Sequence, residues 1–88
     1  MYSKEIIVSN PTGLHARPAS SLVSKANSYE SDITLQRVGE DDVYTVKSII
    51  MLLALGLGQG EKAILAADGP DEEAAVNELA EFIAGLTE

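Results

Sequence analysis

The 88-residue sequence contains no cysteine, no tryptophan and a single histidine. Without cysteine the chain can form neither disulfides nor thiolate metal sites, and it has no thiol nucleophile. One histidine cannot make a histidine-rich metal site, so we expect neither a metal nor a cofactor. Aromatic residues amount to only 5% of the chain. The core must therefore be built mainly from aliphatic side chains.

Positive charge is also scarce, because 6 Lys and Arg stand against 14 Asp and Glu and give a formal net charge of -8. Such a surface repels nucleic-acid phosphates and anionic lipids. The longest apolar run, Ile49 to Leu57, has about half the length of a membrane span. No secretory leader pattern stands at the N-terminus. We expect a cytoplasmic protein that binds no nucleic acid and does not insert into membranes.

The apolar content nevertheless suffices for one small core, since hydrophobic residues make up 45% of the chain. A chain of 88 residues lies at the low end of the single-domain range. We therefore expect one domain over residues 1–88. We also expect a monomer.

Apolar periodicity and turn-forming residues predict the order strand, helix, strand, strand, helix, strand, helix. The expected strands are residues 4–9, 33–36, 43–46 and 62–67. The expected helices are residues 16–27, residues 49–54, and a last helix that opens at Asp71 and reaches Leu86. Amphipathic helices must bury their apolar faces against a sheet. The predicted fold is a two-layer α+β sandwich with an antiparallel or mixed sheet.

Residues 13–19, Gly-Leu-His-Ala-Arg-Pro-Ala, hold the candidate site. Pro18 fits only in the first turn of a helix, so the helix begins at or just after His15. The free amides and positive dipole of a helix start favour an anion on the imidazole and keep the ring neutral and nucleophilic. Arg17 can add a fixed positive charge to the same anion. This combination predicts that His15 handles a phosphoryl group or another anion.

The residues alone leave a second interpretation open, in which His15 caps the helix and Arg17 is a solvated surface charge. No residue pattern supplies a general base, a metal or a pocket for a small substrate. If His15 is a nucleophile, it is therefore expected to carry a group between proteins rather than to turn over a metabolite.

Three motifs closely resemble the HPr family, the histidine-containing phosphocarriers of the bacterial sugar phosphotransferase system. They are residues 13–19, Lys47-Ser48-Ile49 and residues 55–60, in the expected order and separation. The resemblance covers essentially the whole chain. It implies an open-faced β-sandwich, in which three helices cover one face of a four-stranded antiparallel sheet. It also implies a carrier rather than an enzyme.

The resemblance implies that enzyme I phosphorylates His15 on Nδ1 and that His15 passes the group to EIIA domains of sugar permeases. Arg17 would stabilise the phosphoryl group, and the amides of Ala16 and Arg17 would cap its oxygens. Ser48 matches the family's regulatory serine, the target of an ATP-dependent HPr kinase/phosphorylase. A plain helix N-cap is the alternative for Ser48. Met51 departs from the family pattern, which often has Gly there.

The apolar run after Ser48 predicts a docking surface, because a helix of about two turns cannot bury every residue of the run. A partly basic rim around it would suit acidic partner proteins. The expected docking residues are Ile49, Ile50, Leu53, Lys25 and Lys47, with Arg17 nearby.

Three other functions are compatible with parts of the sequence. A regulatory relative that acts as a corepressor through Ser48 would not need His15, so the intact histidine argues against it. A carrier dedicated to nitrogen regulation or to dihydroxyacetone phosphorylation would share the chemistry and differ in its partners. An adaptor protein would tolerate loss of His15.

Overall fold

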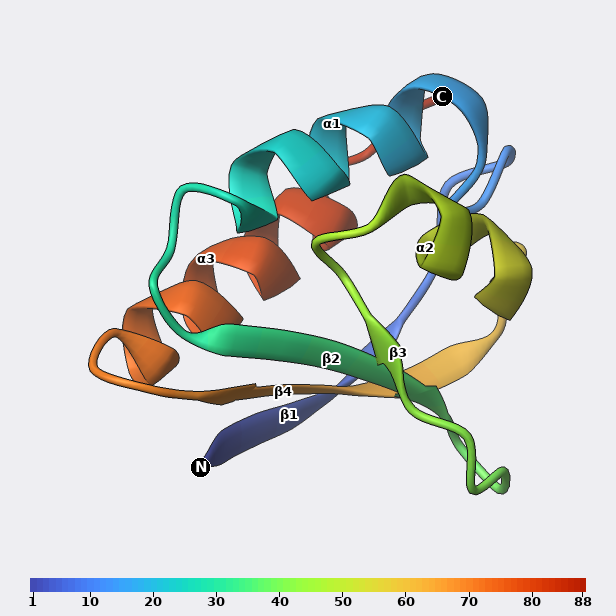
Figure 1. Cartoon of the computed structure of the whole chain (residues 1–88). Coiled ribbons are helices and arrows are strands. Elements are labelled where there is room, and N and C mark those ends of the chain that lie inside the picture. The colour runs from blue at the N-terminus through green and yellow to red at the C-terminus, as the bar shows by residue number, and fades with distance from the viewer.

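The computed structural model describes all 88 residues and shows two layers, a sheet and a set of helices that lie over one of its faces (Figure 1). The strands form one four-stranded sheet, antiparallel at every pairing. In chain order the elements are β1 (Tyr2–Ile7), α1 (Ala16–Ala26), β2 (Asp32–Arg37), β3 (Tyr44–Thr45), α2 (Ile49–Leu55), β4 (Lys62–Asp68) and α3 (Glu72–Ala84). The predicted element order and fold class are confirmed.

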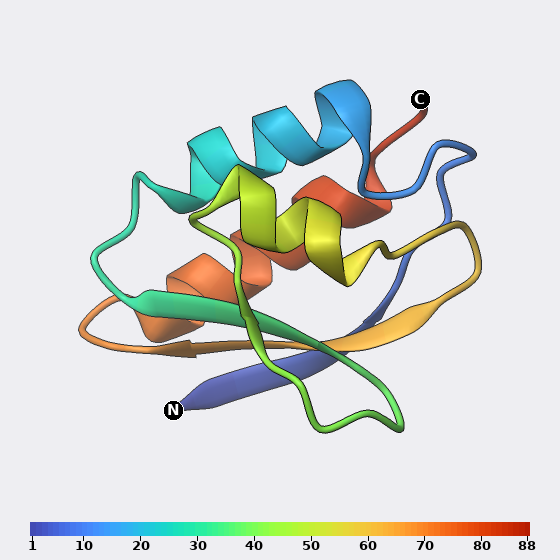
Figure 2. The same cartoon turned by 45° about the vertical axis from the view of Figure 1, so that its right-hand side comes forward.

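The strands lie in the order β1-β4-β2-β3, so β4 is central and pairs with both β1 and β2. Side chains of β4 alternate: Ala63, Leu65 and Ala67 are buried under the helices, whereas Lys62 and Ile64 are exposed. This period of two is what a sheet with one covered face requires. Figure 2 shows the helices together above the sheet and nothing below it.

Several predicted boundaries differ from the structure by one or two residues. β2 and β4 extend slightly beyond the predicted 33–36 and 62–67, and α3 ends at Ala84, two residues before the predicted Leu86. The differences in β1 and β3 have a clear cause. β1 begins and ends two residues earlier than the predicted 4–9, because its ladder stops where Ile7 lies opposite Lys62, the first residue of β4. β3 is only Tyr44–Thr45 rather than 43–46, since just these two residues pair with β2. In both cases the partner strand, and not the local sequence, sets the boundary.

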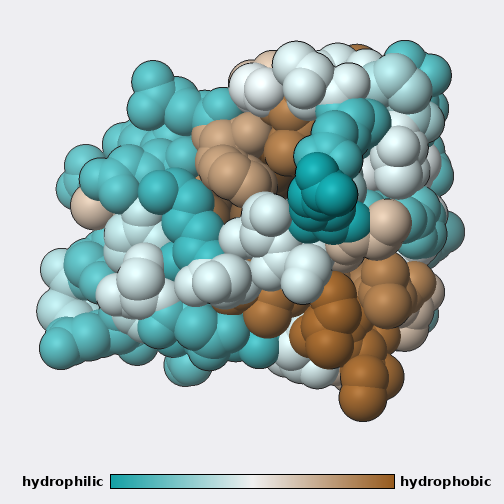
Figure 3. All heavy atoms as spheres, turned by 90° about the horizontal axis from the view of Figure 1, so that it is seen from above, coloured by the Kyte–Doolittle hydropathy of each residue, from teal (hydrophilic) through white to brown (hydrophobic).

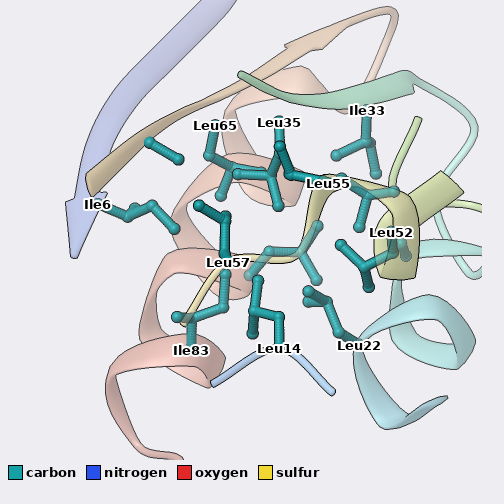
Figure 4. Packing of buried hydrophobic residues seen from close by; sticks show 14 of the residues in the cluster. Ile6, Leu14, Leu22, Ile33, Leu35, Leu52, Leu55, Leu57, Leu65 and Ile83 are labelled. Carbon is teal, nitrogen blue, oxygen red and sulfur yellow. The ribbon is translucent and has the colours of Figure 1, made fainter. Parts of the chain in front are cut away.

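The core is a single cluster of 19 buried hydrophobic side chains. As the composition predicts, it is aliphatic, and Figure 4 shows leucines of the strands and helices meeting between the layers. Leu22 comes from α1, Leu52 and Leu55 from α2, and Leu35 and Leu65 from the sheet. Each fully buried leucine contributes about 1.5–3 kcal/mol of transfer free energy. The aromatic residues Tyr2, Tyr29, Tyr44 and Phe82 are only partly buried and lie around this cluster.

α2 is capped at both ends. Ser48 is the N-cap, and its hydroxyl accepts the Met51 amide at 3.3 Å. Gly56 closes the helix in the left-handed conformation with φ 65°, and its amide donates to the Leu52 carbonyl. None of the three helices is long and apolar enough to cross a membrane.

Asp71, at the start of α3, does not cap its own helix but fixes the connection between α1 and β2. Its carboxylate accepts the Ser31 hydroxyl, and it accepts the amides of Glu30 and Ser31 at 2.9 Å each. The Ser31 hydroxyl, followed by these amides, lowers the pKa of the Asp71 carboxyl below its ordinary range. The start of α3 is thereby held to the segment that leads into β2.

Candidate functional site

Residues 10–15, here called the entry turn, lead from β1 into α1, and Gly13 within it lies directly against the loop after α2. Gly13 has φ +72°, and a Cβ on it would stand 2.6 Å from the Leu57 carbonyl oxygen and 2.8 Å from the Gly58 Cα. The amide of the fully buried Leu14 donates to the same Leu57 carbonyl at 2.9 Å. Only glycine fits this approach of two backbones. The sequence alone does not indicate this close contact.

Asn10 closes the entry turn from inside. It is 1% exposed, and its Nδ2 donates to the Gly13 carbonyl at 2.9 Å and to the Glu88 main-chain oxygen at 2.7 Å. The Gly13 amide donates to the Asn10 carbonyl, and the Thr12 amide donates to Glu88. The local sequence marks Asn10 only as a turn former. Its contact with Glu88 is a tertiary one that no local pattern indicates.

His15 is the N-cap of α1, as predicted, with φ −130° and ψ 167°. Its side chain makes no capping hydrogen bond, and the residue is half-buried. The first amides of a helix have no intrahelical acceptor, and Pro18 has no amide hydrogen, so the free donors of the first turn are the amides of Ala16 and Arg17. The hydrogen-bond geometry therefore does not support the interpretation of His15 as a side-chain cap.

Ala16 turns the chain sharply between His15 and the body of α1. It has φ +52° and is the one non-glycine residue with positive φ. Such a conformation costs an L-residue about 1–3 kcal/mol and persists only where the surroundings enforce it. Here the entry turn is fixed on one side, and the buried Pro18 and Ala19 are fixed on the other. No pattern in the sequence indicates this strained residue.

Arg17 extends into solvent beside His15. Its side chain is 79% exposed, and its Nη1 lies 3.8 Å from the Glu88 Oε2. An exposed ion pair of this length contributes at most about 1 kcal/mol. Arg17 is therefore available to another anion at little cost. Glu88 was not predicted, since a carboxylate at that place in the sequence carries no pattern that marks it as a neighbour of Arg17.

The predicted regulatory and basic residues lie along the other end of α1 and the start of α2. Ser48 is half-buried at its N-cap position. The Lys47 ammonium donates to the Tyr29 carbonyl at 2.7 Å, and Asn27 Nδ2 donates to the Lys47 carbonyl at 3.2 Å. Lys25 lies in the last turn of α1 and is half-buried. Lys47 thus already has an internal partner, whereas Lys25 has no side-chain bond that competes with docking.

The apolar run of α2 divides as the helix geometry requires. Leu52 faces the core, while Ile50 is 76% and Leu53 43% exposed, and Ile49 and Met51 are 37% exposed each. Figure 3, which looks onto the helical layer from above, shows this apolar area as the brown surface over α2. We call Ile49, Ile50, Met51 and Leu53 the α2 surface. Met51 belongs to it, although Met51 was not among the predicted docking residues.

The family described as PTS HPr component phosphorylation site matches residues 2–85 of this chain. The chain belongs to the HPr family. Members of this family are phosphocarriers of the phosphotransferase system and not catalysts in themselves. The resemblance in the sequence motifs is thus confirmed over nearly the whole chain.

Individual relatives agree with this assignment. The phosphocarrier protein HPr of Borreliella burgdorferi is 43% identical over 88 residues, and the alignment covers 100% of both chains. The crystal structure of HPr-C-His from Thermoanaerobacter tengcongensis superposes with a TM-score of 0.89 at 37% identity, covering 96% of this chain and 92% of that one. A phosphocarrier protein HPr from Bacillus anthracis gives 0.86 at 33% identity, covering 92% and 94%. The two solved structures thus share the fold of this chain.

The contact at Gly13 generates a stability prediction. Gly60→Ala places a side chain at φ +88° where nothing lies within 4 Å, so it should cost only the left-handed strain of about 1–2 kcal/mol. Gly13→Ala adds a collision with the Leu57 carbonyl and should cost about 3 kcal/mol or more. Urea unfolding of both variants measures the difference. Equal losses would show that the two backbones do not meet at Gly13.

Proposed function

We propose that this HPr-family protein accepts a phosphoryl group on His15 Nδ1 from phosphorylated enzyme I and donates it to EIIA domains of sugar permeases in the cytoplasm. The carrying observation is that His15 is the N-cap of α1 and that its side chain makes no capping hydrogen bond, so the amides of Ala16 and Arg17 remain free to bind an anion. A helix start of this kind stabilises an anion without any added group. The family assignment supports the same chemistry.

Transfer follows as an in-line displacement. The lone pair of Nδ1 on the neutral imidazole attacks phosphorus, the new N–P bond forms, and the bond between phosphorus and the donor group of enzyme I breaks with its electron pair leaving on the donor. Positioning and electrostatics supply most of the acceleration in such reactions. Donation to an EIIA domain is the same displacement with His15 as the leaving group.

Arg17 and the helix start would hold the transferred group. The phosphoryl oxygens would accept the Ala16 and Arg17 amides, and the Arg17 guanidinium would turn toward them from Glu88. Because the Arg17–Glu88 pair is exposed and 3.8 Å long, exchanging it for a phosphoryl group costs little. The partner protein would supply the remaining groups of the transfer site.

The α2 surface would bind the partners. Ile49, Ile50 and Leu53 offer exposed apolar area next to α1, and Lys25 offers a free cation for acidic partner proteins. Lys47 would contribute less than the sequence suggested, because its ammonium donates to Tyr29. A monomer would leave this surface and His15 accessible to successive partners.

Ser48 would be a regulatory site for an HPr kinase/phosphorylase. A phosphate there would place about two negative charges beside the α2 surface and would alter docking. The alternative function is that of a regulatory HPr paralogue, either a catabolite-repression corepressor or a nitrogen-type phosphocarrier. The complete arrangement around His15 favours the general carrier over a corepressor that acts through Ser48 alone.

The proposal predicts one acid-labile phosphoryl adduct when the protein is incubated with phosphoenolpyruvate and enzyme I. Intact-mass analysis before and after an acid step detects it, since a phosphoramidate hydrolyses in acid. His15→Ala should abolish the adduct, and the matched variant Ser48→Ala should retain it. The proposal is contradicted if the protein with its original sequence forms no adduct, or if the adduct persists in His15→Ala.

If the α2 surface binds the partners, a substitution of Ile50, its most exposed residue, should weaken the interaction with enzyme I. Ile50→Ser should raise the KM of enzyme I for this carrier about tenfold, the loss expected for one apolar anchor. Ile7→Ser is the matched control, because Ile7 is 51% exposed on β1, away from the helices, and should leave KM unchanged. Steady-state phosphotransfer measures both. An equal response of the two variants would exclude α2 as the docking face.

A further inference from the structure

The guanidinium of Arg37, at the end of β2, joins three segments that the transfer chemistry does not use. Its Nε donates to Glu61 Oε2 at 2.6 Å, and its Nη1 donates to Glu40 Oε1 at 3.2 Å. Its Nη2 donates to the carbonyls of Leu55 at 2.8 Å and Gly56 at 3.2 Å, at the C-terminus of α2. The Arg37 side chain is only 24% exposed. Because the guanidinium is planar and donates in several directions at once, it holds these three segments in a fixed arrangement.

Glu61 passes this constraint into the loop of residues 56–61, which joins α2 to β4. One of its carboxylate oxygens accepts from Arg37, and the other accepts the Gly58 amide at 2.9 Å. The hydrogen bond from Arg37, and then that from Gly58, lowers the pKa of Glu61 below its ordinary range. The carboxylate therefore remains ionised near neutral pH and keeps both bonds.

The part of the loop held by Glu61 is the part that touches the entry turn. The Leu57 carbonyl and the Gly58 Cα are the two atoms closest to a Cβ on Gly13, and the Leu57 carbonyl accepts the Leu14 amide. Leu14 immediately precedes His15. A short series of contacts thus connects the Arg37 guanidinium to the backbone that carries the imidazole.

We propose that Arg37 and Glu61 are positioning residues for His15: their ion pair fixes the 56–61 loop against Gly13 and Leu14, and this sets where the imidazole stands at the start of α1. Neither side chain touches the transferred group. The inference rests on the proposed phosphocarrier function for its kinetic consequence only. Its structural consequence, the placement of the His15 ring, is independent of any partner.

Other hydrogen bonds of the 56–61 loop limit the effect of the Arg37–Glu61 ion pair to the Leu57–Gly58 segment. The Val8 amide donates to the Glu61 carbonyl at 2.9 Å, and the Gly60 amide donates to the Val8 carbonyl at 2.6 Å. These bonds tie the later part of the loop to the end of β1 and do not involve the Arg37 or Glu61 side chains. Loss of the pair should therefore release the Leu57–Gly58 segment and leave the sheet intact.

The test uses Glu61→Gln, which preserves the shape of the side chain and removes the charge that holds Arg37 and Gly58 together. The rate constant kcat for transfer from phosphorylated enzyme I should fall about tenfold, as expected when a reacting group is misplaced. KM should be unchanged, because Arg37 still donates to Leu55 and Gly56 at the C-terminus of α2, and the α2 surface therefore stays in place. Glu5→Gln, an exposed carboxylate on β1 without a side-chain hydrogen bond, is the control and should alter neither constant.

Arg37→Lys is the second variant, since lysine keeps the charge but cannot donate to Glu61, Leu55 and Gly56 in one plane. In both variants the His15 ring-proton NMR signals should shift, while Glu5→Gln should leave them in place. A rise in KM with unchanged kcat would assign the pair to docking and overturn the proposal. Unchanged kcat together with unmoved ring signals would also overturn it, as would a failure of both variants to fold.

The two proposals fail in different ways. If the protein with its original sequence takes up no phosphoryl group, the proposed carrier function is wrong. The His15 ring-proton signals of the variants still decide whether Arg37 and Glu61 position His15. If the protein with its original sequence is phosphorylated and Glu61→Gln and Arg37→Lys behave like Glu5→Gln, only the positioning inference is wrong.

Discussion

The approach of the entry turn to the loop after α2 is the contact on which the site depends. Gly13 lies where any side chain would meet the Leu57 carbonyl, and the Leu14 amide bonds to that same oxygen. With this backbone fixed, α1 begins at one place only, and the strained turn at Ala16 is maintained. His15 then stands at the N-cap of this helix. The placement of His15 thus depends on two backbones held together.

Local signals in the chain determine most of the fold. Apolar spacing and Pro18 predict the start of α1, and Ser48 marks the start of α2, because capping is decided within a few residues. Strand boundaries were predicted less well, as β1 and β3 show. A strand ends where its partner stops pairing, and neither segment carries that information itself. Sheet order also depends on tertiary pairing, and local patterns left open whether the sheet was antiparallel or mixed.

The candidate site could be named only where local patterns mark it. His15 and Arg17 could be named because nucleophile, counter-charge and helix start occur within one turn of sequence. The contact of Arg17 with Glu88 and the Arg37–Glu61 pair join segments that are distant in the chain. The sequence does not indicate these pairs, because the chain has a net charge of -8 and nothing distinguishes Glu61 or Glu88 from its other carboxylates. The few cations of this acidic chain therefore act through individual contacts, such as those of Arg17 and Arg37, which only the folded structure shows.

The central claim is that the start of α1 receives the phosphoryl group on His15. The most direct test is a two-dimensional amide NMR spectrum of the protein before and after phosphorylation by enzyme I and phosphoenolpyruvate. The amide signals of Ala16 and Arg17 should move far downfield, as donors to a new anion do, while signals of the sheet remain in place. Unmoved Ala16 and Arg17 amides in a protein phosphorylated on His15 would contradict it.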